Sequence, residues 1–120
     1  MKLKRIASLL LLATLLTLFA SCSNPQDKIL GTWKNEATAL GIPTETTFEF
    51  KEDGSGVKTL PLGIPSPFTY VFENEKLVMT FDVLGIQTTY EYDYLFEGDS
   101  LLTLTKDNEV IELKRATEKN

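Results

Sequence analysis

A tripeptide that recurs at a fixed spacing places the strongest constraint on how this chain folds. Leu-Gly-Ile begins at Leu40, Leu62 and Leu84, so each copy starts 22 residues after the one before. Aromatic residues lie eight and ten positions after each leucine. They are Phe48, Phe50, Tyr70, Phe72, Tyr92 and Tyr94. A period of this length accommodates two short strands and two turns, so the repeating unit is predicted to be a β-hairpin.

Short runs rich in Thr, Val, Phe and Tyr alternate with turn residues along the rest of the chain, which predicts eight strands and no helix. The strands are expected at Gly31–Ala37, Glu45–Lys51, Gly56–Leu60, Phe68–Glu73, Leu77–Asp82, Thr88–Phe96, Leu101–Thr105 and Glu109–Arg115. Their even spacing favours an all-β fold, an antiparallel up-and-down meander. We expect this meander to close into a barrel, because closure removes exposed edge strands.

Apolar and polar residues alternate along the predicted strands, which indicates one buried face and one face in water. The six aromatic residues that follow the repeated tripeptides are therefore expected inside the barrel. Their side chains can fill an eight-stranded interior by themselves, or they can line a cavity for a small apolar ligand. The sequence leaves both alternatives open.

The three Leu-Gly-Ile copies fall in the first, third and fifth connections between predicted strands. Alternate connections of an up-and-down meander lie at the same end, so the copies are expected to meet at one rim. This rim comprises Leu40, Ile42, Leu62, Ile64, Leu84 and Ile86. Loops normally face water, so either these residues fold inward and plug the barrel, which is the simpler explanation, or they receive a ligand or partner.

Residues 1–21 have the order of a secretory signal peptide: three basic residues, an uncharged apolar run and two small residues. The apolar run, residues 6–20, would rise about 22 Å as a helix, which is too short for a hydrocarbon core of roughly 30 Å. The segment Phe19-Ala20-Ser21-Cys22 resembles the lipobox of bacterial lipoproteins. This resemblance implies that Cys22 carries diacylglycerol and an acyl chain such as palmitate, and anchors the chain to a membrane.

The remaining chain divides into a lipidated cysteine with a polar tether (22–28), a barrel domain (29–115) and a polar tail (116–120). After removal of the signal peptide it has 9 basic and 17 acidic residues, a net charge of −8. This charge argues against nucleic acid as a partner and against electrostatic attachment to anionic lipid. The residue after Cys22 is Ser23 and not an aspartate. By analogy with other lipoproteins, this favours the outer membrane of a bacterial cell envelope. The oligomeric state is not indicated.

The chemistry of catalysis is sparse in this chain. It has no histidine, and its one cysteine is assigned to lipid, so the usual general base and the cysteine nucleophile are missing. Glu91 and Asp93 share a strand face, but that face is the one expected to contact water. We therefore predict no catalytic residue, no metal site and no cofactor, and we do not expect an enzyme.

Gly31-Thr32-Trp33 at the start of the first predicted strand is similar to the Gly-X-Trp signature of lipocalins, and Arg115 ends the last strand. Lipocalins place an arginine there, across the tryptophan. The layout resembles small lipocalin-like (calycin-type) β-barrel lipoproteins of the Bacteroidetes type. The resemblance implies that Gly31, Trp33 and Arg115 hold one end of the barrel together, and that a small hydrophobic ligand binds in or at the mouth. The alternative is a non-catalytic protein-interaction or inhibitor module of the cell envelope.

Overall fold

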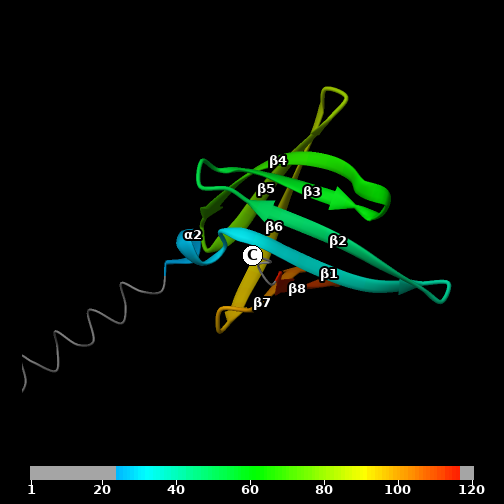
Figure 1. The fold of residues 1–120 in the computed structure, drawn as a ribbon. Coiled ribbons are helices and arrows are strands. Elements are labelled where there is room, and N and C mark those ends of the chain that lie inside the picture. The colour runs from blue at the N-terminus through cyan, green and yellow to red at the C-terminus, as the bar shows by residue number, and fades with distance from the viewer. Residues whose placement is uncertain (1–23, 117–120) are drawn as a thin grey trace, which may run out of the picture.

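The computed structural model describes residues 24–116, so the predicted signal peptide, Cys22 and residues 117–120 of the predicted tail lie outside the described residues. One short helix, eight strands and a 3-10 turn follow one another. They are α2 (Pro25–Lys28), β1 (Gly31–Ala39), β2 (Ile42–Phe50), β3 (Ser55–Leu60), η1 (Pro61–Gly63), β4 (Ile64–Glu73), β5 (Lys76–Val83), β6 (Ile86–Glu97), β7 (Leu101–Lys106) and β8 (Glu109–Arg115). The strands form a closed barrel in chain order, each antiparallel to its neighbours (Figure 1). The predicted eight-stranded up-and-down barrel is confirmed.

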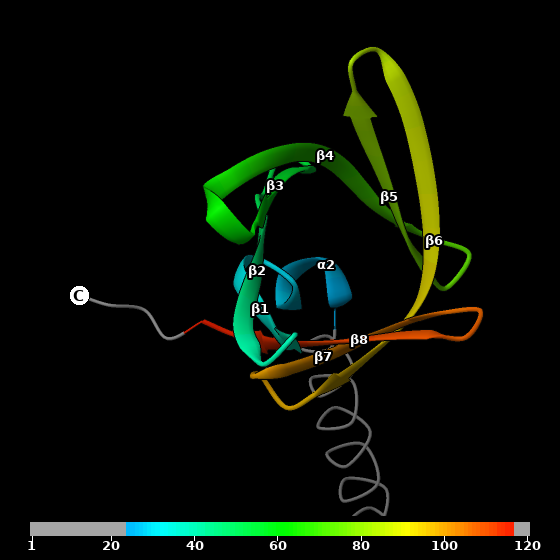
Figure 2. The same cartoon turned by 90° about the vertical axis from the view of Figure 1, so that its right-hand side faces the viewer.

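The two ends of the barrel differ. At the closed end lie α2 and the turns after β2, β4 and β6, and at the open end lie the turns after β1, β3, β5 and β7. Toward the open end the strands separate: β8 pairs with β1 only at Trp33 and Lys34, and β2 pairs with β3 only from Thr47 onward. The hairpins β1–β2, β3–β4 and β5–β6 therefore extend as three arms that diverge from one another (Figure 2).

Proline accounts for part of this separation. Pro43 lies on β2 beyond its last pair with β3, and Pro65 and Pro67 lie on β4 beyond its last pair with β5. Proline has no N–H to donate to a neighbouring strand, so within a sheet it is confined to edges. The repeated segment Leu-Gly-Ile-Pro thus turns the chain and then prevents the next strand from joining the arm.

The strands reach further toward the open end than predicted. Ile42, Ile64 and Ile86 were expected in connections, but each is the first residue of a strand. The connections are short because Leu40 and Leu84, with the glycines that follow them, have φ between 53° and 81°. Two successive residues with positive φ make the type I′ turn, which joins antiparallel strands through only two residues.

The expectation that no segment forms a helix was wrong for Pro25–Lys28, which form α2 within the predicted tether. Asn24 caps this helix by accepting a hydrogen bond from the Gln26 backbone N–H at 2.9 Å, and Pro25 takes the first turn. A single turn is too short to show helical periodicity in the sequence. Ile29, which follows the helix, is fully buried, so this segment is packed onto the closed end.

Ala116, the first residue of the predicted tail, contacts the barrel. The Ala116 backbone N–H donates a hydrogen bond of 2.9 Å to the Thr32 carbonyl oxygen, so the contact between the last strand and β1 continues past Arg115. Both ends of the described chain are therefore joined to the same end of the barrel.

The interior is an aromatic core. Phe50 contacts the rings of Phe68 and Tyr70 edge to face, with ring centroids 5.3 and 5.1 Å apart. Of the six aromatic residues predicted inside, four are at most 8% exposed; these are Phe48, Phe50, Tyr70 and Tyr92. The other two, Phe72 and Tyr94, are partly buried and have centroids 4.9 Å apart. Side chains thus occupy the barrel where a lipocalin-like cavity would otherwise lie.

Stability is expected to fall at high pH because of two core tyrosines. Burial raises the pKa of both Tyr70 and Tyr92 above the ordinary value of 10.0, and Asp53 adds to the effect at Tyr70. The unfolded chain therefore releases these protons at lower pH than the folded chain, so the stabilising contribution is complete below pH 10.0 and is lost above it. Urea unfolding between pH 8 and pH 11 measures the decline. Tyr70→Phe should make the decline shallower, and an unchanged slope would contradict this explanation.

Candidate functional site

Arg115 fastens the closed end. Its guanidinium carbon lies 4.3 Å from the centroid of the Trp33 ring, within the range of a cation–π contact. Nε, Nη1 and Nη2 donate hydrogen bonds of 2.7, 2.7 and 2.6 Å to three backbone carbonyl oxygens. The acceptors belong to Asp99, Leu30 and Lys28 respectively. One side chain therefore joins β8, the β6–β7 turn and the segment that leads from α2 into β1.

Trp33 and Gly31 complete this arrangement. The Trp33 ring is fully buried, and its Nε1–H donates to the Ile29 carbonyl oxygen at 2.8 Å. Gly31 has a φ of 111°, and a Cβ at this position would lie 3.0 Å from Nη1 of Arg115. These three residues meet as the resemblance implied, and their hydrogen bonds are directed at the chain's own backbone, which favours a structural role.

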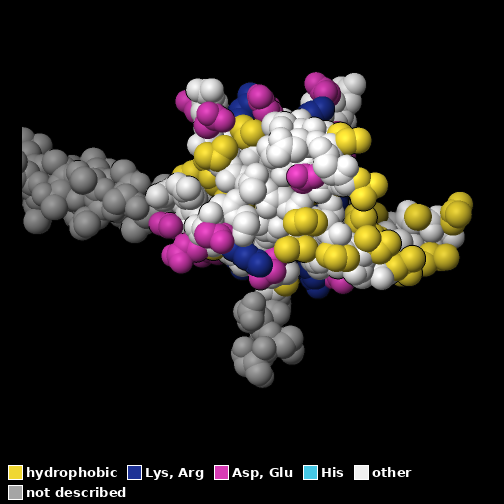
Figure 3. All heavy atoms as spheres, turned by 90° about the horizontal axis from the view of Figure 1, so that it is seen from above, with side chains coloured by type: hydrophobic (Ala, Val, Ile, Leu, Met, Phe, Trp, Pro, Cys, Tyr) yellow, Lys and Arg dark blue, Asp and Glu magenta, His cyan; other side chains and the backbone are white. Residues whose placement is uncertain are grey.

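The apolar residues of the predicted rim lie at the open end, on three separate arms. We call the turns Leu40-Gly41, Leu62-Gly63 and Leu84-Gly85 the Leu-Gly tips. Their leucines are 97 to 101% exposed, and the isoleucines that follow them are 53 to 69% exposed. Hydrophobic side chains gather toward this end of the molecule (Figure 3). The simpler expectation, that these residues fold inward and plug the barrel, does not hold, because two- and three-residue turns leave no chain with which to fold back.

Leucine is a poor residue for these turns. All three tip leucines have positive φ, between 53° and 79°. A side chain other than glycine, asparagine or aspartate pays roughly 1 to 2 kcal/mol in the left-handed region. The leucines recover none of this cost by burial within the domain. Domain stability does not explain them, so a contact outside the domain is the better explanation.

Leu84→Asn is accordingly expected to stabilise the protein by about 1 kcal/mol, since Asn-Gly is the preferred pair of a type I′ turn. Urea unfolding measures the change. Leu84→Ala is the matched control, because it removes the same apolar surface without introducing a residue that tolerates positive φ. Equal stabilities of the two variants would contradict the strain argument.

The inner wall of the barrel is hollowed at the open end, between the β3–β4 and β5–β6 arms. Lys58 pairs directly with Phe48 across β2 and β3, and paired residues share a face, so its side chain is on the inner side. It lines a cavity of about 180 Å³, which we call the mouth pocket. The lining residues are Lys58, Leu60, Ser66, Phe81, Val83, Thr88 and Tyr90.

Lys58 is the one charged residue among those that line the mouth pocket. Its Nζ lies 5.4 Å from the centroid of the Phe48 ring and 5.7 Å from that of Phe81. Within residues 24–116, no carboxylate forms an ion pair with it. The sequence pattern concealed this residue, because β3 turns Gly56 and Lys58 inward and Val57 outward, opposite to what hydrophobicity predicts.

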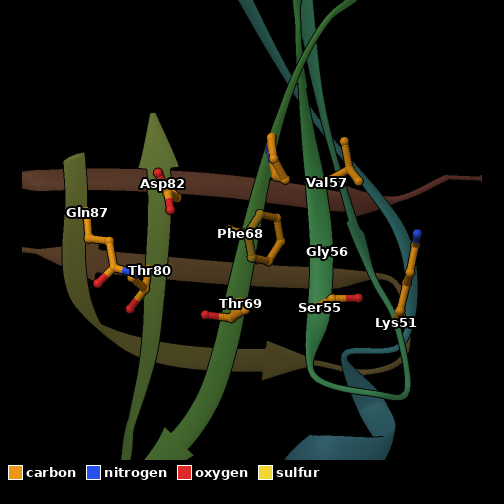
Figure 4. A pocket seen from close by; sticks show the side chains of 10 residues that line it. Lys51, Ser55, Gly56, Val57, Phe68, Thr69, Thr80, Asp82 and Gln87 are labelled. Carbon is orange, nitrogen blue, oxygen red and sulfur yellow. The ribbon is translucent and has the colours of Figure 1, made fainter. Parts of the chain in front are cut away.

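A second hollow, the outer groove, lies on the opposite face of the same two arms and has a volume of about 420 Å³. Figure 4 shows the lining residues Thr80 and Asp82 on β5 and Thr69 on the neighbouring strand β4, with the Phe68 ring near Gly56. Two of its polar side chains on β5 hydrogen-bond within the chain. Asp82 Oδ1 accepts from the Gly85 N–H at 3.2 Å, and the Thr80 and Thr89 hydroxyls lie 3.1 Å apart. Lys51, Thr69 and Gln87 also line the outer groove, and their side chains form no hydrogen bond or ion pair with other described residues.

The carboxylates considered for catalysis lie on the outer surface. Asp93 is exposed and forms an ion pair of 2.8 Å with Nζ of Lys76, and Glu91 is exposed on the same strand. In the part of the chain that the structure describes, no three acidic, histidine or cysteine side chains gather as metal ligands would. Over the same residues, no helix has the length and apolar character needed to span a bilayer.

Comparison with known proteins gives one match. A model described as a family of unknown function, DUF5640, matches residues 27–114, which include all of the barrel except its last residue. Neither the curated proteins nor the solved structures gave a significant match.

Proposed function

The chain belongs to the DUF5640 family, whose function is unknown, and from the geometry of its open end we propose that it is a non-catalytic binding protein for a small amphipathic molecule. The meeting of Gly31, Trp33 and Arg115 at the closed end supports its likeness to lipocalin-like proteins. In this proposal the ligand binds at the mouth and not deep in the barrel, because aromatic side chains occupy the core.

The mouth pocket is the observation that carries the proposal. Apolar walls from Leu60, Phe81 and Val83 combine there with hydroxyl groups and a single ammonium group. Ligand sites characteristically combine apolar walls with a few polar groups. Its volume of about 180 Å³ corresponds to roughly six water molecules at about 30 Å³ each, so it suits a small molecule or one end of a longer one.

We further propose that lipid on Cys22 anchors the protein, in the outer membrane of a bacterial envelope. The described chain begins at Asn24 and enters the barrel at the closed end. An anchor two residues earlier would hold the closed end near the membrane and turn the mouth pocket away from it. Incorporation of radiolabelled palmitate, and its loss in Cys22→Ala, tests the anchor.

A pocket-filling variant tests the binding function. Ser66→Phe places a ring in the mouth pocket, whereas Thr69→Phe places the same ring on the exposed outer face of the same strand, in the outer groove. Small molecules extracted from the purified full chain are compared by mass spectrometry. Molecules enriched with wild type and Thr69→Phe should be depleted at least fivefold with Ser66→Phe. Equal enrichment in all three proteins, or no enrichment in any, would overturn the proposal.

The exposed leucines of the Leu-Gly tips favour a second candidate, a protein-interaction or inhibitor module of the envelope. The triple substitution Leu40→Asn, Leu62→Asn and Leu84→Asn removes the apolar tips while it relieves the strained turns. If the tips bind a protein, cross-linked partners recovered with wild type should be lost from this variant. Unchanged recovery would eliminate the tips as the docking site.

A further inference from the structure

We propose that the mouth pocket recognises an organic carboxylate with an apolar chain, and that the ammonium group of Lys58 binds the carboxylate. This inference rests on the proposed function and names its ligand class. It depends on the position of Lys58 at the inner wall, on the aromatic rings beside it and on the absence of a carboxylate partner among the described residues.

Lys28, Lys51, Lys58 and Lys114 form no ion pair among the described residues, and of these four only Lys58 lines the mouth pocket. Lys34, Lys76 and Lys106 form ion pairs with Glu45, Asp93 and Asp107, at 3.4, 2.8 and 3.2 Å. Lys58 is partly buried, faces inward and has no such partner among the described residues. An ammonium group that has no carboxylate partner and lies at the wall of an apolar pocket can bind an anion that enters the pocket.

The aromatic rings beside Lys58 attract its ammonium group but provide no negative charge to pair with it. The Phe48 and Phe81 rings attract a cation through their faces, but a ring does not accept the three N–H bonds that an ammonium group can donate. Ser66 lies directly opposite Lys58 in the β3–β4 register and lines the same pocket. Its hydroxyl can give a carboxylate a second donor, and such charge-assisted hydrogen bonds are roughly twice as strong as neutral ones.

The nearest other charged residues neither compete with Lys58 for an anion nor pair with it. Lys106 lies near the mouth with its Nζ 5.9 Å from the Tyr90 centroid, but it is paired with Asp107. Asp82 belongs to the outer groove, on the opposite face of β5 from Phe81. The positive charge of Lys58 is therefore local to the inner wall of an otherwise acidic domain.

The apolar part of the ligand follows from the shape of the pocket. A cavity of about 180 Å³ holds a carboxylate and several methylene groups beside Leu60 and Val83. A longer chain would leave between the two arms, where Ile64 and Ile86 are 53% and 69% exposed. The ligand class is thus an alkyl carboxylate of short to medium length.

Octanoate and 1-octanol, which differ in charge at equal chain length, are the probes. Their binding to the full chain in lipid nanodiscs is measured by calorimetry, with empty nanodiscs subtracting partition into lipid. We expect wild type to bind octanoate at least tenfold more tightly than octanol. Lys58→Met should abolish this preference, so that octanoate binds no more tightly than octanol, whereas Lys58→Arg should preserve it. Lys114→Met is the matched control, because Lys114 is exposed on β8.

The outcomes separate this inference from the proposed function. Equal binding of both probes to wild type, or a preference for octanoate that survives in Lys58→Met, would overturn the carboxylate inference and leave a small-molecule pocket in place. If neither probe bound above the empty nanodiscs, both proposals would fail. Circular dichroism spectra that match wild type show that a variant has folded, and Lys58→Gln, which is also neutral, takes the place of Lys58→Met if that variant does not fold.

Discussion

Replacement of Arg115 with alanine is expected to lower the free energy of unfolding by about 3 kcal/mol. A hydrogen bond to a charged group contributes roughly 1.5 to 3 kcal/mol, and a cation–π contact roughly 0.5 to 2 kcal/mol. Arg115 makes three such hydrogen bonds and lies over Trp33, but its side chain is only partly buried, so water recovers part of the loss.

Urea unfolding of Arg115→Ala beside Lys114→Ala isolates this effect, because Lys114 is the exposed neighbour on the same strand. Arg115→Lys should be intermediate. Its ammonium group keeps the charge, but it lacks the planar fork that reaches several acceptors at once. If Arg115→Ala were no less stable than Lys114→Ala, the barrel would not depend on this fastening.

The alternation of residue types and the 22-residue repeat were sufficient to predict the strands and their order, because both express a physical period of the backbone. Side chains in a strand alternate between faces, and a hairpin consumes a fixed length of chain. The closed end was also accessible, since Gly31, Trp33 and Arg115 are distinctive residues at the two ends of the barrel sequence.

The arrangement of the open end could not be predicted from the sequence in the same way. Which face of β3 is buried depends on its register with β2, and a short strand that reads Gly-Val-Lys-Thr-Leu gives the wrong preference. Lys58 therefore went unnoticed as a lining residue. The exposure of the Leu-Gly tips also depends on turn geometry, which places leucine where asparagine is usual. Both failures of local rules occur in the one region where we propose function, as is common at functional sites.

Gly56→Ala is expected to destabilise the protein by about 3 kcal/mol or more, which lies at the upper end of the cost of overpacking a core. Gly56 is buried on β3, and its φ lies outside the left-handed region, so an alanine could adopt the backbone. The obstacle is space. An added Cβ would lie 2.4 Å from the Glu49 carbonyl oxygen and 2.4 Å from Cζ of the Phe68 ring.

Neither neighbour can yield cheaply. The Glu49 oxygen belongs to β2, where it is held by the pairing of β2 with β3, and the Phe68 ring is buried between Phe50 and Phe81, with centroids 5.3 Å from each. Thermal and urea unfolding of Gly56→Ala are compared with Gly98→Ala, whose Cβ would meet no atom within 4 Å although its φ is 63°. Gly98→Ala carries the conformational cost alone, roughly 1 kcal/mol.

A third variant separates the two contacts. Phe68→Leu removes the ring but leaves the Glu49 oxygen. Gly56→Ala should therefore lower the free energy of unfolding of Phe68→Leu by less than it lowers that of wild type, but still by a measurable amount. If Gly56→Ala had no cost in Phe68→Leu, the whole cost would come from the ring. If the cost were the same as in wild type, it would come from the Glu49 oxygen. Stability of Gly56→Ala equal to that of Gly98→Ala would show that β2 and β3 can move apart at this point. In that case, tight packing at Gly56 would not explain why Lys58, two residues further along the same face of β3, lies at the inner wall.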